Sequence, residues 1–265
     1  DVKVWRTHHS LISNAQIEAL KPVLQPGDVL LERREWYLSN IGLPGYWPHA
    51  ALYIGTEQQR RDYFSDPAVK QWVAQQDANA QDLNGLLKLK YPQAYALSQK
   101  PQEQAHQVRL LEAISEGVSF TTLEHSASAD ALMVLRPRLS KKEKAVALFR
   151  AFHFSGRPYD FNFDFLTDAS LVCTELVAKA YEPGDGIDKG LRFPLLDILG
   201  RKATPANEIA RQFDETYATE QQQFDFVLFL DGHEYSDKAI ESDLAGFRAS
   251  WQRPKWHILT QEKQP

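Results

Sequence analysis

The chain has 265 residues, of which 43% are hydrophobic and 25% are charged, and its formal net charge is −5 at pH 7. These values are typical of one large globular domain, or of a core domain with additions, and we expect a soluble protein. The acidic balance argues against a general nucleic-acid binder, and the sequence lacks the run of about 18 apolar residues that would span a membrane.

The N-terminal segment predicts a short helix followed by two strands. A capping-box pattern runs from Ser13 to Gln16 and opens the helix. A turn signal then leads into a strand at Val29–Leu31, and a second strand is expected at His49–Gly55. Residues 36–48, which lie between the two strands, are rich in Trp, Tyr, Gly and Pro and predict an ordered aromatic loop.

The next segment differs in composition. From about 57 to 107 it is rich in Gln, Asp, Ala and Lys, and we interpret it as a helical insertion. Asp66 followed by Pro67 is typical of the start of a helix, because the aspartate caps the first turn and proline suits the first helical position. Two further strands are expected at Val108–Ile114 and Ala131–Arg136.

The remainder predicts mainly helices. A second capping box at Ser140–Glu143 opens a helix that Gly156 ends. An aromatic loop at 159–165 leads into another helix that contains Cys173. Beyond residue 195 the expected elements are a helix that opens at Thr204 and Pro205, a strand at Phe224–Leu230, and a final amphipathic helix that carries Ile240, Leu244, Phe247 and Trp251.

Cys173 is the candidate nucleophile. It is the single cysteine, which excludes intramolecular disulfides and metal sites built from several cysteines. Most lone cysteines are inert packing residues, so the evidence for a nucleophile has to come from the position of Cys173. Leu176 and Val177 lie on one apolar helix face, which places Cys173 at or near a helix start. There, unpaired N–H groups and the positive end of the dipole would favour a thiolate and stabilise an oxyanion.

His49 and Glu112 are its candidate partners. His49 is the one of eight histidines that opens a predicted strand directly after an aromatic loop. Strand alternation places Glu112 on the same face as Leu110, which should be buried. A buried carboxylate is costly unless it is paired, and an imidazolium would offset that cost. The alternatives are a histidine satisfied by backbone, a carboxylate that reaches water at a strand edge, and a metal site of the three residues, which lacks recognisable ligand spacing.

Four segments carry a resemblance to a known family. They are Pro26–Leu31 (PGDVLL), Pro48–Gly55 (PHAALYIG), Leu110–Ala113 (LLEA) followed by Gly117 and Val118, and Val172–Val177 (VCTELV). Over about residues 24 to 182 the chain resembles the permuted papain-like cysteine amidases, the YiiX/YebB-like branch of the NlpC superfamily. The resemblance implies an α+β, circularly permuted papain-like (NlpC-type) fold. In this fold a small antiparallel β-sheet packs against helices, and the histidine strand precedes the cysteine helix.

The resemblance also implies roles for the candidate residues. Cys173 would be the nucleophile and His49 the base that takes its proton. Glu112 would orient the ring as the third member, and Asn162 or Asp164 would take that place if either lies there instead.

Three aromatic residues are further candidates for contacting the substrate or its oxyanion, namely Tyr159, Trp47 and Tyr53. Tyr159 belongs to a Pro-Tyr-Asp segment at 158–160 that matches the family's approach to the cysteine, and a purely packed aromatic is the alternative. The resemblance implies neither a metal nor an organic cofactor.

The implied activity is a cysteine hydrolase that cleaves an amide bond in a peptide, a cell-wall fragment or an N-acyl compound through a thioester intermediate. The alternatives are an acyltransferase or thioesterase that acts on lipid-like substrates, and a non-catalytic binding protein that retains the fold. The expected partners are a small peptide, an amino-acid amide or an acyl substrate, and not nucleic acid. The family favours the bacterial periplasm or cell envelope, with the cytoplasm as the alternative.

The resemblance and the composition together predict the domain organisation. We expect a catalytic domain over residues 1–194 that includes the helical insertion at about 57–107. Residues 195–265 would form a C-terminal α/β extension packed on the same domain.

Overall fold

The computed structural model describes residues 5–7, 9–36, 45–114, 116–156, 169–198 and 201–261. Its centre is a seven-stranded sheet in the order β4-β3-β2-β1-β5-β8-β9, and every neighbouring pair is antiparallel. A separate hairpin joins β6 to β7. The strands are β1 (Val29–Arg33), β2 (His49–Tyr53), β3 (Val108–Ile114), β4 (Gly117–Thr122), β5 (Ala131–Pro137), β6 (Leu196–Ile198), β7 (Arg201–Ala203), β8 (Phe224–His233) and β9 (Lys238–Ser242).

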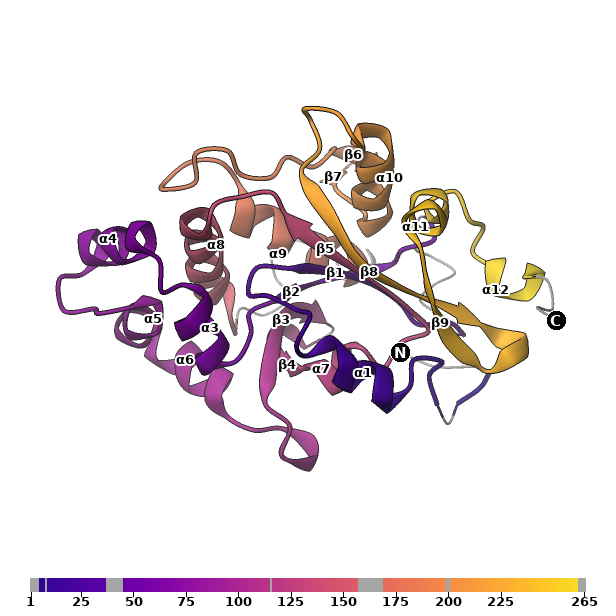
Figure 1. Ribbon diagram of the computed structural model, residues 1–265, viewed down its shortest axis with the longest axis horizontal. Helices are drawn as coiled ribbons and strands as arrows, with labels where there is room; N and C mark the ends of the chain where they lie inside the picture. Colours follow the sequence, from indigo (N-terminus) through magenta and orange to yellow (C-terminus); the bar gives the residue numbers. More distant parts are fainter. Residues whose placement is uncertain are drawn as a thin grey trace.

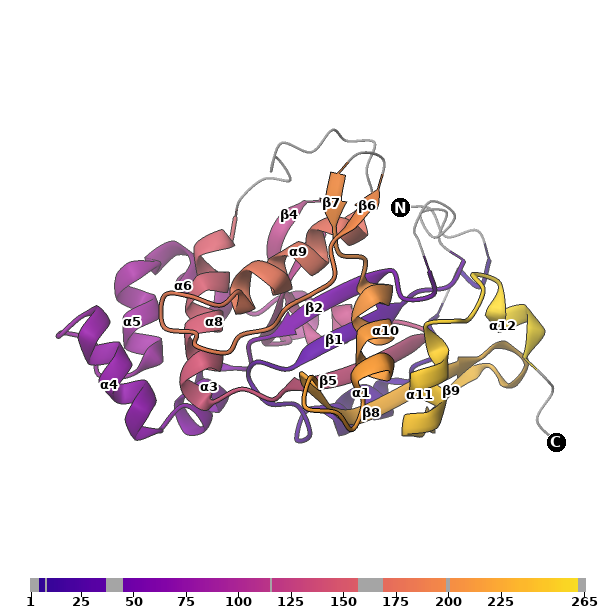
Figure 2. The same cartoon turned by 90° about the horizontal axis from the view of Figure 1, so that it is seen from above.

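Helices cover both faces of this sheet. Figure 2 shows α8, α9, α10 and α11 in a row over one face, whereas α1 and α7 lie on the other face (Figure 1). These helices are α1 (Asn14–Leu20), α7 (Leu123–Ser126), α8 (Lys141–Phe154), α9 (Ala169–Tyr181), α10 (Ala206–Thr216) and α11 (Leu244–Ser250). The short α12 (His257–Thr260) and η2 (Glu234–Ser236) complete the C-terminal part.

Each face of the sheet has its own apolar core, because successive side chains of a strand point to opposite faces. Leu31 and Leu52 join the core under α8 and α9, whereas Leu30 and Ala51 join the core under α1 and α7. A polar residue on either set of strand positions therefore faces a packed interior and needs a partner there.

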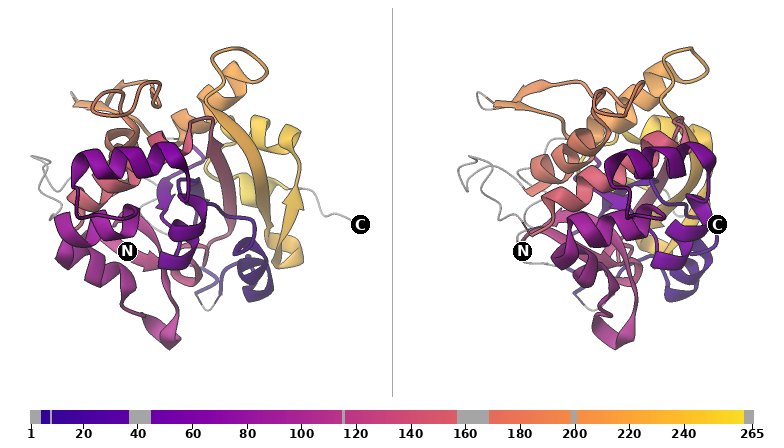
Figure 3. Two further views of the ribbon diagram at one scale, coloured as in Figure 1. Left: turned by 60° about the vertical axis from the view of Figure 1, so that its left-hand side comes forward. Right: turned by 90° about the vertical axis from the view of Figure 1, so that its left-hand side faces the viewer.

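The segment between β2 and β3 is helical, as the composition predicts. It contains α3 (Glu57–Tyr63), α4 (Pro67–Gln76), α5 (Leu83–Lys90), α6 (Pro92–Gln99) and η1 (Glu103–Ala105). Figure 3 shows these helices grouped at one end of the sheet, and α4, α5 and α6 contact α8. The predicted start of α4 is confirmed, since the Asp66 side chain accepts from the Ala68 N–H and Pro67 takes the first helical position.

The two predicted capping boxes are also confirmed. Ser13 and Gln16 exchange hydrogen bonds at the start of α1, and Ser140 and Glu143 do the same at the start of α8. Each box satisfies two of the backbone N–H groups that a helix start leaves without an intrahelical acceptor.

The C-terminal segment extends the main sheet. β8 pairs with β5 and β9 pairs with β8, so the sheet is larger than the small one expected, although its antiparallel α+β character is confirmed. The prediction that Ile240 belongs to the final helix was wrong, because it lies in β9 opposite Asp231, and α11 begins only at Leu244. Pairing with β9 satisfies the backbone groups on the outer edge of β8, which outweighs the helical spacing of the apolar residues.

Phe247 on α11 tests whether this segment and the core form one folding unit. Its ring is fully buried and contacts the rings of Trp47 and Phe229. We expect Phe247→Ala to lower the free energy of unfolding by about 3–5 kcal/mol and to preserve a single transition in urea. Tyr235→Ala, at a side chain that is 59% exposed, should change it by no more than about 0.5 kcal/mol. Two separate transitions in the Phe247 variant would mean that the C-terminal segment unfolds on its own.

Candidate active site

His49 opens β2, and its ring meets a buried carboxylate from the neighbouring strand. Alternation along β2 points His49 toward the face that carries Ala51 and Tyr53. Its side chain is 21% exposed, and its Nε2–H donates to Oε2 of Glu112 over 2.6 Å. A bond of this length between an imidazole and a carboxylate is typical of a charge-assisted pair.

Glu112 lies in the middle of β3 with no exposed surface, which excludes the alternative of a carboxylate that reaches water. Its second oxygen, Oε1, accepts from the hydroxyl of Thr121 on β4 over 2.5 Å. Burial alone would raise the pKa of Glu112, but hydrogen bonding from His49, the charge of that ring and the Thr121 hydroxyl hold the pKa well below its usual range. The carboxylate is therefore ionised and has a donor on each oxygen.

Cys173 approaches this pair beyond the end of the ladder between β2 and β3. The ladder between β2 and β3 contains two pairs, Leu52 with Leu111 and Tyr53 with Leu110. The N–H of Tyr53 points to β1, so alternation directs the N–H of Ala50 toward β3. There it donates to Sγ of Cys173 over 3.3 Å instead of to a strand carbonyl. The sulfur, carried by α9, thus occupies a position that a ladder hydrogen bond would otherwise take.

The thiol and the ring also interact directly. Burial alone would lower the pKa of His49, but the charge and hydrogen bond of Cys173, together with those of Glu112, raise it well above its usual 6.5. Because Nε2 donates to Glu112, Nδ1 is the ring nitrogen that remains for the sulfur. The structure thus brings together Cys173, His49 and Glu112, three residues from α9, β2 and β3.

Cys173 does not lie at the first residue of its helix, where the effect of the helix start on a thiol would be strongest. α9 begins at Ala169, so Cys173 is its fifth residue. Its own N–H lies beyond the four that lack an intrahelical acceptor, and the field of the helix end falls off within the first turn. The helix start therefore contributes less here than expected, and His49 and the Ala50 N–H are among the groups that contact the sulfur, with the Thr174 hydroxyl at 4.0 Å.

Glu32 is a fourth polar residue of the site that the sequence analysis missed. It lies on β1 directly opposite His49, is 1% exposed, and accepts from the hydroxyl of Ser126 over 2.5 Å. Burial, and then the charge of Glu112, raise the pKa of Glu32 to about 7. A carboxylate on an apolar strand face was the signal that identified Glu112. The same pattern is present at Glu32, but the strand was predicted to end at Leu31, so Glu32 was not recognised as a strand residue.

Three of these side chains have the chemistry of metal ligands. One oxygen each of Glu32 and Glu112 and one ring nitrogen of His49 lie within 4.8 Å of one another. Such donors are of the kind that binds Zn²⁺, but Nε2 of His49 and Oε2 of Glu112 already bond to each other over 2.6 Å, so we assign no metal site to this group. Cys173 does not belong to this group, so the metal set considered from the sequence is not the one that the fold assembles.

The other candidate residues do not join the site within the described part of the chain. Trp47 is fully buried, and its indole N–H donates to Ser250 over 2.8 Å. Tyr53 is also fully buried, and its hydroxyl donates to Oε1 of Gln59 over 2.9 Å. Neither presents a group to the thiol. Tyr159 lies outside the described residues, as do Asn162 and Asp164.

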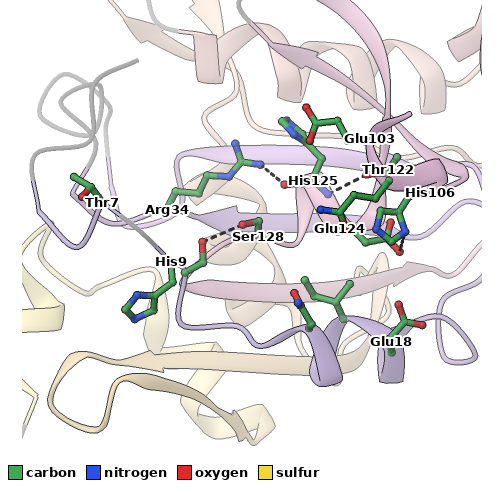
Figure 4. Close-up of a pocket in the computed structure, with 14 residues that line it drawn as sticks. Thr7, His9, Glu18, Arg34, Glu103, His106, Thr122, Glu124, His125 and Ser128 are labelled. Carbon is green, nitrogen blue, oxygen red and sulfur yellow. Dashed lines mark hydrogen bonds and ion pairs between the residues drawn. The ribbon is translucent and has the colours of Figure 1, made fainter. Parts of the chain in front are cut away.

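A polar pocket of about 510 Å³ opens on the side of α1 and α7 (Figure 4). Its walls include Arg34, His106 and His125, and Nη2 of Arg34 donates to the carbonyl of His125 over 3.1 Å. Cys173, His49 and Glu112 are not among its lining residues. The pocket is therefore a separate cavity, but it shares Arg34 with the site, because Nη2 of this residue also lies 3.8 Å from Oε2 of Glu32.

The chain is similar to a described protein family over most of its length. A family model described as "Permuted papain-like amidase enzyme, YaeF/YiiX, C92 family" matches residues 23–225. Searches of curated proteins and of solved structures returned no match. Among the described residues, the helices are too short or too polar to cross a lipid bilayer.

Thr121→Val tests the support of Glu112, because it removes the hydroxyl donor and keeps the shape. A buried charged oxygen would lose its hydrogen bond, so we expect the free energy of unfolding at pH 7 to fall by about 1.5–3 kcal/mol. The lowered pKa of Glu112 contributes stability above its unfolded value of 4.5, and this contribution is lost as the pH falls through the folded value. The difference between variant and wild type should therefore shrink below pH 4.5.

Ser119→Ala is the matched control for this measurement. Ser119 lies on the same strand, but its hydroxyl bonds to the carbonyl of Gly117. Its effect should be small and independent of pH, and urea unfolding between pH 3 and 7 measures both variants. If the free energy of unfolding falls by the same amount at every pH in Thr121→Val, the assigned role of Thr121 is contradicted.

Proposed function

Because the chain belongs to the family of permuted papain-like amidases, we propose that it is a cysteine hydrolase that cleaves an amide bond through a thioester intermediate. The observation that carries this proposal is the position of His49 between two partners. The ring bonds to the carboxylate of Glu112 over 2.6 Å, and the thiol of Cys173 is near enough for its charge and hydrogen bond to raise the pKa of the ring. Such a ring can accept a proton from the thiol while it is held in one orientation.

In the first step His49 takes the proton of the Cys173 thiol on Nδ1. The thiolate attacks the carbonyl carbon of the amide and forms a carbon–sulfur bond, and the carbonyl electron pair moves onto oxygen. Glu112 stays ionised and stabilises the imidazolium without taking its proton. The low pKa of Glu112 and the raised pKa of His49 support this division of charge.

In the second step the tetrahedral intermediate collapses. The carbon–nitrogen bond breaks, and the imidazolium of His49 gives its proton to the departing amine. Water then attacks the thioester with His49 as its base, which releases the acid and restores the thiol of Cys173. Each proton that leaves sulfur or water passes through the same ring, so no other acid or base is required.

Two features favour an enzyme over an idle binding protein. All three side chains of the nucleophilic arrangement are present, and their polar atoms are matched to one another. In addition, His49 and Glu112 form a buried ionisable pair with strongly shifted pKa values, which is typical of functional sites. A buried ion pair contributes little to stability by itself, so stability alone does not account for it.

Substitution of Cys173 tests the covalent step. Against a panel of peptides, cell-wall fragments and N-acyl amides, Cys173→Ala and Cys173→Ser should lower kcat by about 10³-fold or more for whichever amide the wild type hydrolyses. Circular dichroism and thermal unfolding should show that both variants keep the fold. Turnover that persists in the alanine variant would rule out covalent cysteine catalysis.

Alkylation tests the pairing of thiol and imidazole without knowledge of the substrate. The chain has a single cysteine, so any thiol adduct seen by mass spectrometry reports Cys173. Because a thiolate reacts and a thiol does not, His49→Gln should slow iodoacetamide labelling of the native protein at pH 6 by about tenfold or more. His106→Gln, at a histidine that lies in the wall of the separate pocket, should leave the rate unchanged. Equal rates in wild type and His49→Gln would contradict the proposed pair.

A further inference from the structure

Glu32 gives the site a second buried carboxyl, and the proposed mechanism does not use it. We propose that Glu32 is a positioning residue that carries a proton in acid and a charge in base, and thereby sets the upper limit of the pH range over which His49 stays protonated. This inference rests on the proposed function where it concerns catalysis, but its stability measurement needs no activity.

The groups that face Glu32 come from every element around it. His49 faces it from β2, and Glu112 from β3, with ligand-type atoms of all three residues within 4.8 Å. On the side of α7 it accepts from the hydroxyl of Ser126, and Arg34 holds Nη2 3.8 Å from its Oε2. Its neighbour on β5 is the apolar Leu132.

The two carboxylates differ in the hydrogen bonds that they accept. Glu112 accepts on both oxygens, from His49 and Thr121. Glu32 accepts on Oε1 only, and its buried Oε2 accepts no hydrogen bond from any described residue. An ionised oxygen without a donor is costly in an interior, so Glu32 takes up a proton before Glu112 does. With Glu32 neutral, the imidazolium and Glu112 balance each other in charge.

Ionisation of Glu32 then favours the protonated form of His49. A second negative charge within 4.8 Å of the ring opposes loss of the imidazolium proton. The thiolate–imidazolium pair of Cys173 and His49 therefore persists to higher pH than Glu112 alone would allow. In acid Glu32 is neutral and has no such effect, so its influence is confined to the alkaline side.

Glu32→Gln should change the alkaline side of the pH profile and not the acid side, because glutamine resembles the protonated carboxyl and cannot ionise. In the bell-shaped dependence of kcat/KM on pH, we expect the acid limb to stay in place. The alkaline limb should move to lower pH by about one unit, the size expected for a partly screened charge at this distance. Glu124→Gln, which removes a carboxylate from the same helix as Ser126, should move neither limb.

Two results would overturn the proposal. If both limbs move, Glu32 is ionised throughout the range and does not act as a switchable charge. If neither limb moves and the rate falls uniformly, Glu32 has only a structural role.

The stability of the same variant gives a second, independent test. A carboxyl whose pKa is higher in the folded protein than in the unfolded chain costs stability as the pH rises above 4.5 and through about 7. In EDTA, wild type and Glu32→Gln should therefore unfold at the same temperature near pH 5. At pH 8 the variant should unfold several degrees higher. A wild type that is the more stable protein at pH 8 would contradict protonation of Glu32.

Combining the measurements separates failure of this inference from failure of the proposed function. Suppose that Glu32→Gln unfolds at a higher temperature than the wild type at pH 8 but not at pH 5, and that no amide is hydrolysed. The proposed protonation of Glu32 would then stand, and the hydrolase function would be rejected. Zn²⁺ supplies the remaining control, because ligands that bind the folded state raise its unfolding temperature. If Zn²⁺ stabilises the wild type but not Glu32→Gln at pH 8, a divalent cation and not a proton neutralises Glu32, and the proposal is wrong.

Discussion

The buried carboxylate of Glu112 constrains the rest of the site, because it has no contact with water and must be matched by donors within the protein. Thr121 satisfies one oxygen and His49 satisfies the other. The charge that remains on Glu112 stabilises the protonated ring, which is the form that a thiolate requires beside it. This requirement fixes the orientation of His49, and Glu112 acts together with the charge and hydrogen bond of Cys173 to raise the pKa of the ring.

The meeting of sulfur and ring depends on an incomplete ladder between β2 and β3. Had the strands paired as far as Ala50, its N–H would have bonded to a carbonyl, and Cys173 on α9 would have been separated from His49 by the sheet. Because the ladder contains only two pairs, the sulfur takes the place of a strand acceptor. Backbone groups at the end of regular pairing still need partners, and the sulfur supplies one for the Ala50 N–H.

The elements added to this core pack against it and extend its sheet. The helices between β2 and β3 pack against α8, and β8 and β9 extend the sheet beyond β5. The family match over residues 23–225 extends as far as the first residues of β8, and it confirms the resemblance that the four sequence segments carry. The C-terminal segment instead contributes aromatic residues such as Phe247, which pack against Trp47 and complete the core.

Local patterns were enough to predict most of the helices and strands and to single out three residues that the fold brings together. Capping boxes at Ser13 and Ser140 were correct because a cap is encoded within four residues, and Glu112 stood out because a carboxylate on an apolar strand face demands a partner. The position of Glu32 opposite His49 and the hydrogen bond from Trp47 to Ser250 became visible in the folded protein alone. Register between strands and burial depend on contacts between distant parts of the chain, which local patterns do not encode.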